Sequence, residues 1–254
     1  MEPVYAPVVA IAKVLFRAQG LKFSIKGEEN MPRKGGAVIA VNHTGYLDFL
    51  YAGKAMVPAK RYIRYMAKQE VFDHRITGPI MRSLKHIPVD RVAGSGAYEA
   101  AVQALRDGEL VGVYPEATIS RSFELKEFKS GAARMAIEAN VPIIPIVVWG
   151  AQRVWTKGHP KQLGRTNTPI SVSVGAPIVP FEPASELTAK LKSAMQEMLL
   201  TVQDEYGPHP EGAYWVPRRL GGSAPTLEEA TELDRRDTEA RIAARKAKEQ
   251  AGPQ

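Results

Sequence analysis

Two residue types that together can move a proton, a histidine and an aspartate, stand five positions apart at the end of an apolar run. His43 follows the run AVIAV at residues 37–41, and Asp48 follows a turn that contains Gly45. A carboxylate that accepts one imidazole N–H fixes the tautomer and makes the other nitrogen more basic. That nitrogen can take a proton from a hydroxyl group. The alternative interpretation is that Asp48 caps the next helix and His43 has no chemical role.

Three further apolar segments share this organisation. Residues 86–89 precede Asp90 and Arg91, residues 110–113 lead through Tyr114 and Pro115 to Glu116, and residues 141–146 carry two prolines. Polar side chains that follow buried strands collect at one edge of a parallel sheet, where loops form clefts. The segments therefore predict one site built from several strand ends.

The order and spacing of the four segments resemble the four sequence blocks of the glycerolipid acyltransferase family, over roughly residues 25–185. Within that family the chain looks most like the bacterial lysophosphatidic acid acyltransferases. The resemblance implies transfer of a fatty acyl group from acyl-CoA or an acyl carrier protein to the free hydroxyl of 1-acylglycerol-3-phosphate, which gives phosphatidic acid. Another lysophospholipid or glycophospholipid acceptor is an alternative, as is a catalytically silent lipid-binding homologue.

The resemblance also implies roles for matching residues. His43 is expected to be the general base and Asp48 the residue that orients it. Lys68 and Arg91 are expected to bind the acceptor phosphate, and an arginine fork suits that task. The remaining acceptor-pocket candidates are Glu116 and Thr118, and further Thr44, Tyr46, Ala117, Arg121 and Lys129.

The third block departs from the family pattern Glu-Gly-Thr-Arg. Here it reads Glu116-Ala117-Thr118-Ile119, so alanine replaces the glycine and isoleucine replaces the arginine. The phosphate loses one expected cationic contact. Arg121 or Lys129 can supply a substitute charge, although neither stands at the matching position, and a bulkier headgroup is a further alternative.

Neither an acyl-enzyme nor a metal is expected. The chain has no cysteine, and Ser120 and Ser122 do not stand in a G-x-S-x-G elbow, so direct transfer between two bound substrates is predicted. No histidine pair has the spacing of metal ligands on a helix, and we expect no cofactor beyond the acyl-CoA or acyl-ACP co-substrate. A thioesterase that hydrolyses the donor is a rival enzyme.

Apolar runs alternate with helical patterns for about 200 residues, which predicts an α/β fold with a central, mostly parallel mixed β-sheet flanked by helices. We expect strands at residues 37–41, 62–67, 86–89, 110–113, 143–148 and 170–174. Helices are expected at residues 4–17, 48–56, 71–84 with a break near Gly78-Pro79, 95–106, 128–139 and 184–206.

Three segments are predicted along the chain: an N-terminal amphipathic helix at 1–24, an acyltransferase domain at 25–206, and a Pro/Gly-rich linker with a charged tail at 207–254. The N-terminal stripe Val4, Val8, Ile11 and Leu15 fits either a helix in the membrane interface or a core-packing helix. The tail is expected to be a solvated helix or disordered, with a partner-binding role as a further alternative.

The net charge of +7 indicates an anionic partner. Residues 226–250 carry about −1, so the rest of the chain carries +8. No nucleic-acid-binding motif occurs, and neither a membrane-spanning run nor a signal peptide is predicted. The expected partners are a lysophospholipid acceptor, an acyl thioester donor and a membrane surface, with peripheral attachment at the cytoplasmic side of the plasma membrane.

Overall fold

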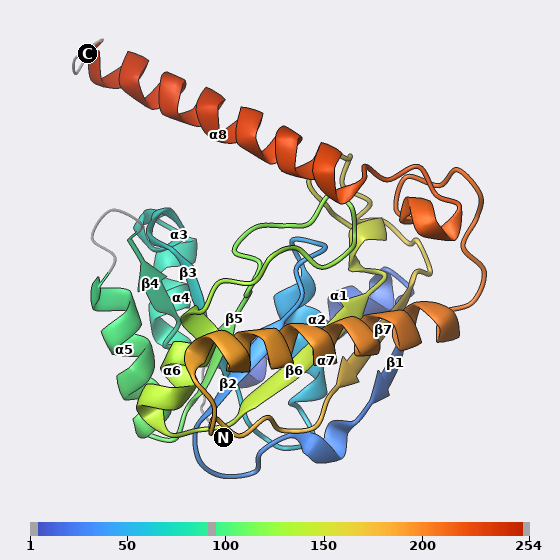
Figure 1. Cartoon of the computed structure of the whole chain (residues 1–254). Helices are drawn as coiled ribbons and strands as arrows, with labels where there is room; N and C mark the ends of the chain where they lie inside the picture. Colours follow the sequence, from blue (N-terminus) through green and yellow to red (C-terminus); the bar gives the residue numbers. More distant parts are fainter. Residues whose placement is uncertain (1–4, 91–94, 251–254) are drawn as a thin grey trace. The chain divides into compact units, whose positions relative to one another are not determined.

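A computed structural model of the chain describes residues 5–90 and 95–250 (Figure 1). The strands are β1 (Lys22–Lys26), β2 (Ala37–Val41), β3 (Ile63–Lys68), β4 (Ile87–Val89), β5 (Leu110–Val113), β6 (Ile143–Trp149) and β7 (Pro169–Val174). The α-helices are α1 (Tyr5–Ala18), α2 (Asp48–Ala55), α3 (Gln69–Asp73), α4 (Thr77–Ser83), α5 (Ser95–Arg106), α6 (Gly131–Ala139), α7 (Ala184–Glu205) and α8 (Leu227–Gln250). Three short 3₁₀ helices are η1 (Glu28–Asn30), η2 (Ala151–Arg153) and η3 (Arg218–Leu220).

Within the described residues, seven strands form one sheet in the order β1-β7-β6-β2-β5-β3-β4. All neighbouring pairs are parallel except β6 and β7, which are antiparallel. The expected α/β fold with a mostly parallel mixed sheet is therefore confirmed. β2 lies at the centre between β5 and β6, and every residue of β2 and β6 is buried, as continuous apolar runs predict. Because β2, β5, β3 and β4 run parallel to one another, their carboxyl ends lie at the same edge of the sheet.

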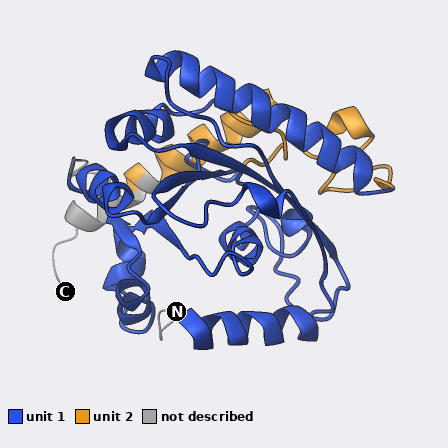
Figure 2. Cartoon of the chain, turned by 90° about the horizontal axis from the view of Figure 1, so that it is seen from below, with its two compact units in different colours: residues 1–119, 127–207 blue, residues 120–126, 208–254 orange. Residues whose placement is uncertain are grey.

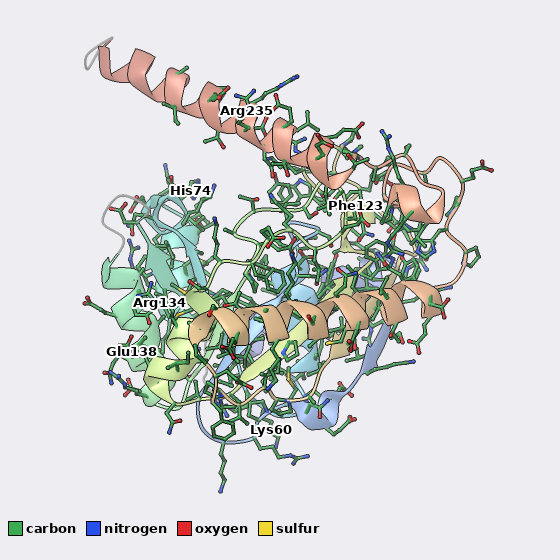
Figure 3. All side chains as sticks on the ribbon, in the orientation of Figure 1. Lys60, His74, Phe123, Arg134, Glu138 and Arg235 are labelled. Atoms are coloured by element: carbon green, nitrogen blue, oxygen red, sulfur yellow. The ribbon has the colours of Figure 1, made fainter. Side chains whose placement is uncertain are left out.

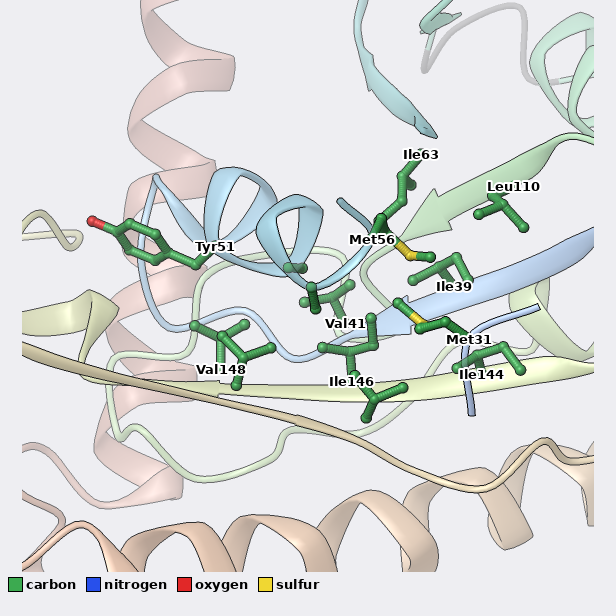
Figure 4. Close-up of a cluster of buried hydrophobic side chains, with 14 of the residues drawn as sticks. Met31, Ile39, Val41, Tyr51, Met56, Ile63, Leu110, Ile144, Ile146 and Val148 are labelled. Carbon is green, nitrogen blue, oxygen red and sulfur yellow. The ribbon is translucent and has the colours of Figure 1, made fainter. Parts of the chain in front are cut away.

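Helices cover both faces of the sheet (Figures 1 and 2). On one face α1 and α2 pack over a core in which Ile39 and Val41 of β2 meet Ile144 and Ile146 of β6 (Figure 4). On the other face α7 contacts β6 and α6 contacts β2. Burial of one large aliphatic side chain stabilises a fold by about 1.5–3 kcal/mol. This double-sided burial holds the central strand, and with it the residues that follow, in a fixed place.

Helix α1 has two different apolar faces. Tyr5 and Phe16 are buried, and the Tyr5 hydroxyl donates a hydrogen bond to the Leu84 carbonyl at 2.9 Å. Ile11, Val14 and Leu15 are 60%, 66% and 53% exposed. The core-packing interpretation thus holds for the side that carries Tyr5 and Phe16, while the membrane-interface interpretation stays a prediction, for which the exposed apolar side is available.

The structure differs from the expected elements in three places. Strand β1, an edge strand of alternating Lys, Phe, Ser and Ile residues that pairs with β7, was not predicted from the sequence. The break expected near Gly78-Pro79 instead separates α3 from α4 at residues 74–76, and Pro79 stands in the first turn of α4. A proline is tolerated there, whereas deeper in a helix its ring meets the carbonyl four residues earlier. Helix α6 begins at Gly131 rather than at 128, because the Lys129 N–H donates to the Pro115 carbonyl.

The described chain divides into two compact units, which Figure 2 colours separately. Residues 1–119 and 127–207 form the first unit, which contains the sheet, and residues 120–126 and 208–254 form the second. In the second unit the tail is helical: Thr226 and Glu229 form a reciprocal capping box at the start of α8. The boundaries at 24 and 206 expected from the sequence remain a prediction.

Candidate active site

The central strand is prolonged by a side chain just before His43. Asn42 is fully buried, its Nδ2 donates to the Val148 carbonyl at 3.1 Å, and its Oδ1 accepts the Val148 N–H at 2.7 Å. The amide thus pairs with β6 as a backbone unit would. The next residue, His43, therefore leaves the sheet from a fixed position at its carboxyl edge.

His43 and Asp48 are in direct contact. Nδ1 of His43 lies 3.0 Å from Oδ2 of Asp48, and the same oxygen accepts the N–H groups of Thr44 and Gly45, each at 2.9 Å. The Asp48 side chain is fully buried, whereas that of His43 is 17% exposed. An ionised Asp48 requires the proton of a neutral imidazole on Nδ1, so Nε2 is the nitrogen able to accept a proton.

The turn between the two residues depends on Gly45. A Cβ atom at this position would stand 3.0 Å from the Ala151 and Trp155 carbonyl oxygens, closer than such contacts normally come. This approach allows the Gly45 N–H to reach Asp48 and the Tyr46 N–H to reach the Trp155 carbonyl at 3.0 Å. Residues 43–48 thereby form a hydrogen-bonded loop.

Two opposing effects act on the carboxyl of Asp48. Burial raises its pKa above the usual value, because a charge is disfavoured away from water. The contact with His43 and the N–H groups of Gly45 and Thr44 act in the opposite direction, because they stabilise the carboxylate. A buried carboxylate with three donors on one oxygen is held rigidly in place, which suits a residue that orients an imidazole.

An aromatic stack fixes the plane of the His43 ring. Tyr114 lies parallel to it, with ring centroids 3.9 Å apart and planes 14° from parallel, and Tyr65 stacks on Tyr114 at 6.3 Å. The Tyr65 hydroxyl donates to the Phe49 carbonyl at 3.0 Å, at the start of α2. Burial raises the pKa of both tyrosines well above the usual value, so both phenols stay neutral. The stack restricts rotation of the imidazole about its side-chain bonds.

Glu116 holds the backbone of His43. Its Oε1 accepts the His43 N–H at 2.8 Å, and the residue is 4% exposed. Ala117, which follows it, has a left-handed backbone with φ of 62° and an exposed side chain. Thr118 is half-buried. The Glu116 carboxylate therefore joins the segment that follows β5 to the segment that follows β2 at the carboxyl edge of the sheet.

The other acceptor-pocket candidates lie in different surroundings. Thr44 is 2% exposed, and its carbonyl accepts a hydrogen bond from the Thr156 hydroxyl at 2.7 Å. Tyr46 is 42% exposed, and its ring lies 4.7 Å from that of Trp155. Arg121 belongs to the second unit and pairs there with Asp237 of α8.

Lys68, Lys129 and Ala117 line one cavity of about 320 Å³ at the carboxyl ends of β3 and β5. Arg91 lies outside the described residues. The structure thus brings His43 into contact with both Asp48 and Glu116, and both lysines line one cavity. The roles expected for all of these residues in catalysis and binding stay predictions.

Two residues of the site, Asn42 and Tyr114, were not predicted from the sequence. Both stand close to predicted residues, Asn42 directly before His43 and Tyr114 two positions before Glu116. Position at a strand end was the available signal: a short amide can extend a ladder, and an aromatic ring there faces the neighbouring strand end.

Neither a metal cluster nor a spanning helix occurs in the described part of the chain. Residues 5–90 and 95–250 contain no group of three or more His, Cys, Asp or Glu side chains placed to hold a metal ion. Over the same residues, no helix has both the length and the hydropathy needed to cross a membrane.

The chain is similar to known acyltransferases. The sequence model of the family described as "Acyltransferase" matches residues 22–149. A 1-acyl-sn-glycerol-3-phosphate acyltransferase of Bacillus subtilis is 28% identical over 74% of this chain and 93% of its own length. A probable enzyme of the same name from Mycoplasma pneumoniae is 30% identical over 58% of this chain and 56% of its own length.

A solved structure shares the fold. The crystal structure of the 1-acyl-sn-glycerophosphate acyltransferase PlsC from Thermotoga maritima superposes with a TM-score of 0.64 at 20% identity, over 78% of this chain and 79% of that one. The matched family segment runs from β1 to the end of β6 and so includes the His43–Asp48 loop and Glu116. On this match, which spans half of the chain, the protein belongs to the acyltransferase family and is an acyltransferase.

Proposed function

We propose that this acyltransferase moves a fatty acyl group from an acyl thioester, carried by coenzyme A or acyl carrier protein, onto the free hydroxyl of 1-acylglycerol-3-phosphate. The product is phosphatidic acid. The single observation that carries the proposal is the contact between His43 Nδ1 and Asp48 Oδ2 at 3.0 Å, with the imidazole partly exposed at the carboxyl edge of the sheet. The relatives named above support the choice of acceptor.

The chemistry follows from the orientation of the imidazole. Nε2 of His43 takes the proton of the acceptor hydroxyl as its oxygen attacks the thioester carbonyl carbon. The C–S bond breaks, and the leaving thiolate takes the proton from the His43 imidazolium, so that the imidazole returns to its neutral form. Asp48 stabilises the imidazolium that forms between these steps. A positioned general base contributes on the order of 10²–10⁴ in rate.

The enzyme must meet its amphiphilic acceptor at a membrane surface, and α1 has the properties that this requires. Ile11, Val14 and Leu15 present an exposed apolar face, with Lys13 and Arg17 exposed on the same helix. Apolar insertion combined with attraction to anionic headgroups binds a protein reversibly to a leaflet. We place this peripheral attachment at the cytoplasmic side of the plasma membrane, where acyl thioesters are available.

The test is a thiol-release assay with acyl-CoA or acyl carrier protein as donor and a panel of lysophospholipids as acceptors. The expected result is thiol release that requires lysophosphatidate and yields phosphatidic acid. Thiol release without any acceptor would identify a thioesterase, and preference for a lysophospholipid with a larger headgroup would reassign the acceptor. Absence of thiol release with every pair would contradict the proposed reaction.

A further inference from the structure

Residues 120–126 lie in the connection from β5 to α6, yet they form the second compact unit together with residues 208–254 (Figure 2). Shortly before them in the chain stand Glu116 and Thr118, which belong to the first unit. The C-terminal part of the molecule thus forms one unit with a loop, here called the 120–126 loop, that directly follows a segment of the candidate active site.

Both basic residues of the 120–126 loop pair with carboxylates of α8. Nη2 of Arg121 lies 2.5 Å from Oδ2 of Asp237, and its Nε lies 3.5 Å from Oδ1 of Asp234. Nζ of Lys126, the last residue of the loop, lies 2.5 Å from Oδ2 of Asp234. Asp234 therefore bridges two cations that stand near opposite ends of the loop.

These ion pairs are sheltered from water. The side chains of Arg121 and Asp234 are each 16% exposed, and that of Lys126 is 18% exposed. A sheltered pair is screened less by salt than a surface pair, and losing one partner is more costly because the other charge stays away from water. Removing the Asp234 charge therefore takes a counter-charge from two partly buried cations at once.

The 120–126 loop has a conformation that needs support from its surroundings. Phe123, which Figure 3 labels, has a left-handed backbone with φ of 58°, rarely adopted by a residue with a Cβ atom. Its side chain is 1% exposed. The Ser120 hydroxyl donates to the Glu124 carbonyl at 2.7 Å, and the Glu124 carboxylate pairs with Arg219 of η3 at 3.3 Å. Because a strained backbone persists only where its surroundings hold it, the loop is expected to shift when the ion pairs are broken.

The segment before the loop contacts the proposed base. Oε1 of Glu116 accepts the His43 N–H at 2.8 Å, and three residues separate Glu116 from the loop. The Lys129 N–H, shortly after the loop, donates to the Pro115 carbonyl at 2.9 Å. A shift of the loop therefore acts on a short stretch of chain that is fixed at Pro115 and carries the Glu116 carboxylate.

We propose that Asp234 is a positioning residue of the acyl transfer. By pairing with Arg121 and Lys126 it holds the 120–126 loop, and through the loop it holds the Glu116 carboxylate against the backbone of His43. The inference rests on the proposed function, because it concerns the base of that reaction. It gives the C-terminal part of the chain a role in catalysis, in place of the solvated tail expected from the sequence.

The test begins with Asp234→Asn in the full-length protein, a change that keeps the shape of the side chain and removes its charge. A displaced base lowers the rate of the chemical step, so kcat with lysophosphatidate and acyl-CoA is expected to fall about three- to tenfold. The KM values for both substrates are expected to stay within about twofold of the wild-type values, because the proposal assigns Asp234 no substrate contact. Asp234→Glu, which keeps the charge, is expected to recover most of the lost kcat.

A double-mutant cycle with Glu116→Ala separates positioning from a merely structural role. If Asp234 acts through Glu116, the variant that carries both Asp234→Asn and Glu116→Ala has the kcat of Glu116→Ala alone, within about twofold. Losses that multiply would overturn the inference, because they would show that Asp234 and Glu116 act independently. Circular dichroism checks folding. Should Asp234→Asn fail to fold, Asp237→Asn, at a side chain that is 37% exposed, takes its place in the cycle with the same expectation.

Glu232→Gln is the matched control, because it also removes from α8 a carboxylate that pairs with two cations. These are Arg235, labelled in Figure 3, at 2.8 Å and Arg236 at 2.7 Å. Both belong to α8 itself and Glu232 is 40% exposed, so kcat is expected to stay at the wild-type value. An unchanged kcat in Asp234→Asn would overturn the inference, as would an equal loss in Glu232→Gln. Failure of the wild-type protein to acylate lysophosphatidate would contradict the proposed function alone, and the cycle is then run with the acceptor that supports thiol release.

Discussion

Oδ2 of Asp48 accepts three hydrogen bonds, from Nδ1 of His43 at 3.0 Å and from the backbone N–H groups of Thr44 and Gly45 at 2.9 Å. One buried oxygen therefore sets both the tautomer of the imidazole and the shape of the loop that carries it.

Replacing Asp48 by asparagine is expected to lower kcat by on the order of 10³–10⁴, because the amide no longer stabilises an imidazolium and can favour the wrong tautomer. His43→Ala is expected to abolish transfer. Thiol release is the measurement, with circular dichroism as the control for folding. Turnover close to that of the wild-type protein in His43→Ala would rule out His43 as the base.

Glu116→Ala is expected to lower kcat by about tenfold, because the His43 N–H loses its acceptor and the loop can shift. Glu116→Gln is the matched control: an amide oxygen can still accept this N–H, so its activity is expected to remain within a few-fold of the wild-type value. Steady-state kinetics with saturating acceptor and donor measure both variants. Equal losses in the two variants would mean that the carboxylate charge, rather than the hydrogen bond, matters.

Ala117→Gly is expected to stabilise the protein by about 1 kcal/mol, because the left-handed backbone at φ of 62° strains a residue that has a Cβ atom. Urea unfolding monitored by circular dichroism gives the free energy of unfolding. A control at Ala136, a buried residue inside α6, is expected to lose stability on the same change. A destabilised Ala117→Gly variant would show that Ala117 contributes contacts that outweigh the strain.

The free energy of unfolding is expected to fall as the pH drops from 6.5 to 4. His86 accepts the Tyr65 N–H on Nδ1 at 3.0 Å, and burial together with the nearby Arg64 lowers its pKa to about 4. As the pH falls, His86 of the unfolded chain, with a pKa near 6.5, binds a proton before His86 of the folded protein does. The contribution of the neutral His86 to stability is therefore complete above pH 6.5 and is lost progressively below it. By pH 4 the loss is about 3 kcal/mol, because each unit of pKa difference corresponds to about 1.4 kcal/mol.

Urea titrations at several pH values check this expectation. His86→Asn, whose side-chain oxygen can accept the same N–H without titrating, is expected to flatten the curve between pH 4 and 6.5. An unaltered slope in this variant would show that other groups cause the acid loss of stability.

Ile11→Ser combined with Leu15→Ser is expected to weaken binding to vesicles at least tenfold, because both side chains are more than half exposed on α1 and each loses apolar area that would be buried in lipid. Flotation with vesicles that contain an anionic lipid measures binding. Ile242→Ser on α8, where the side chain is 51% exposed, is the control and is expected to bind as the wild-type protein does. Equal binding by all three proteins would exclude α1 as the membrane contact.

Much of the fold could be predicted because a strand buried on both faces has a recognisable local pattern, a continuous run of apolar residues. The runs at β2, β5 and β6 are apolar on both sides, and their predicted bounds agree with the structure to within one residue. β1 was missed because an edge strand needs only two inward side chains, Phe23 and Ile25, and its lysines resemble those of a loop. The break between α3 and α4 depends on how a proline is accommodated in a first turn, which a residue pattern does not specify.

Residues of the candidate site could be predicted only where few residue types can perform the required chemistry. A histidine and an aspartate at a strand end suggest a base and its partner, and the structure brings the two into contact. Glu116 was expected to line the acceptor pocket, which stays a prediction, and the structure shows that its carboxylate accepts the His43 N–H. That contact joins segments 73 residues apart in the chain, so it depends on the pairing of β2 with β5 and on no local signal.

The amide of Asn42 has a consequence for how the chain can vary. Both of its polar atoms are occupied, one by the Val148 carbonyl and one by the Val148 N–H. Aspartate lacks the donor, glutamine is one methylene too long, and serine cannot reach both atoms at once. In an alignment of homologous sequences, position 42 is therefore expected to tolerate as little change as the histidine that follows it.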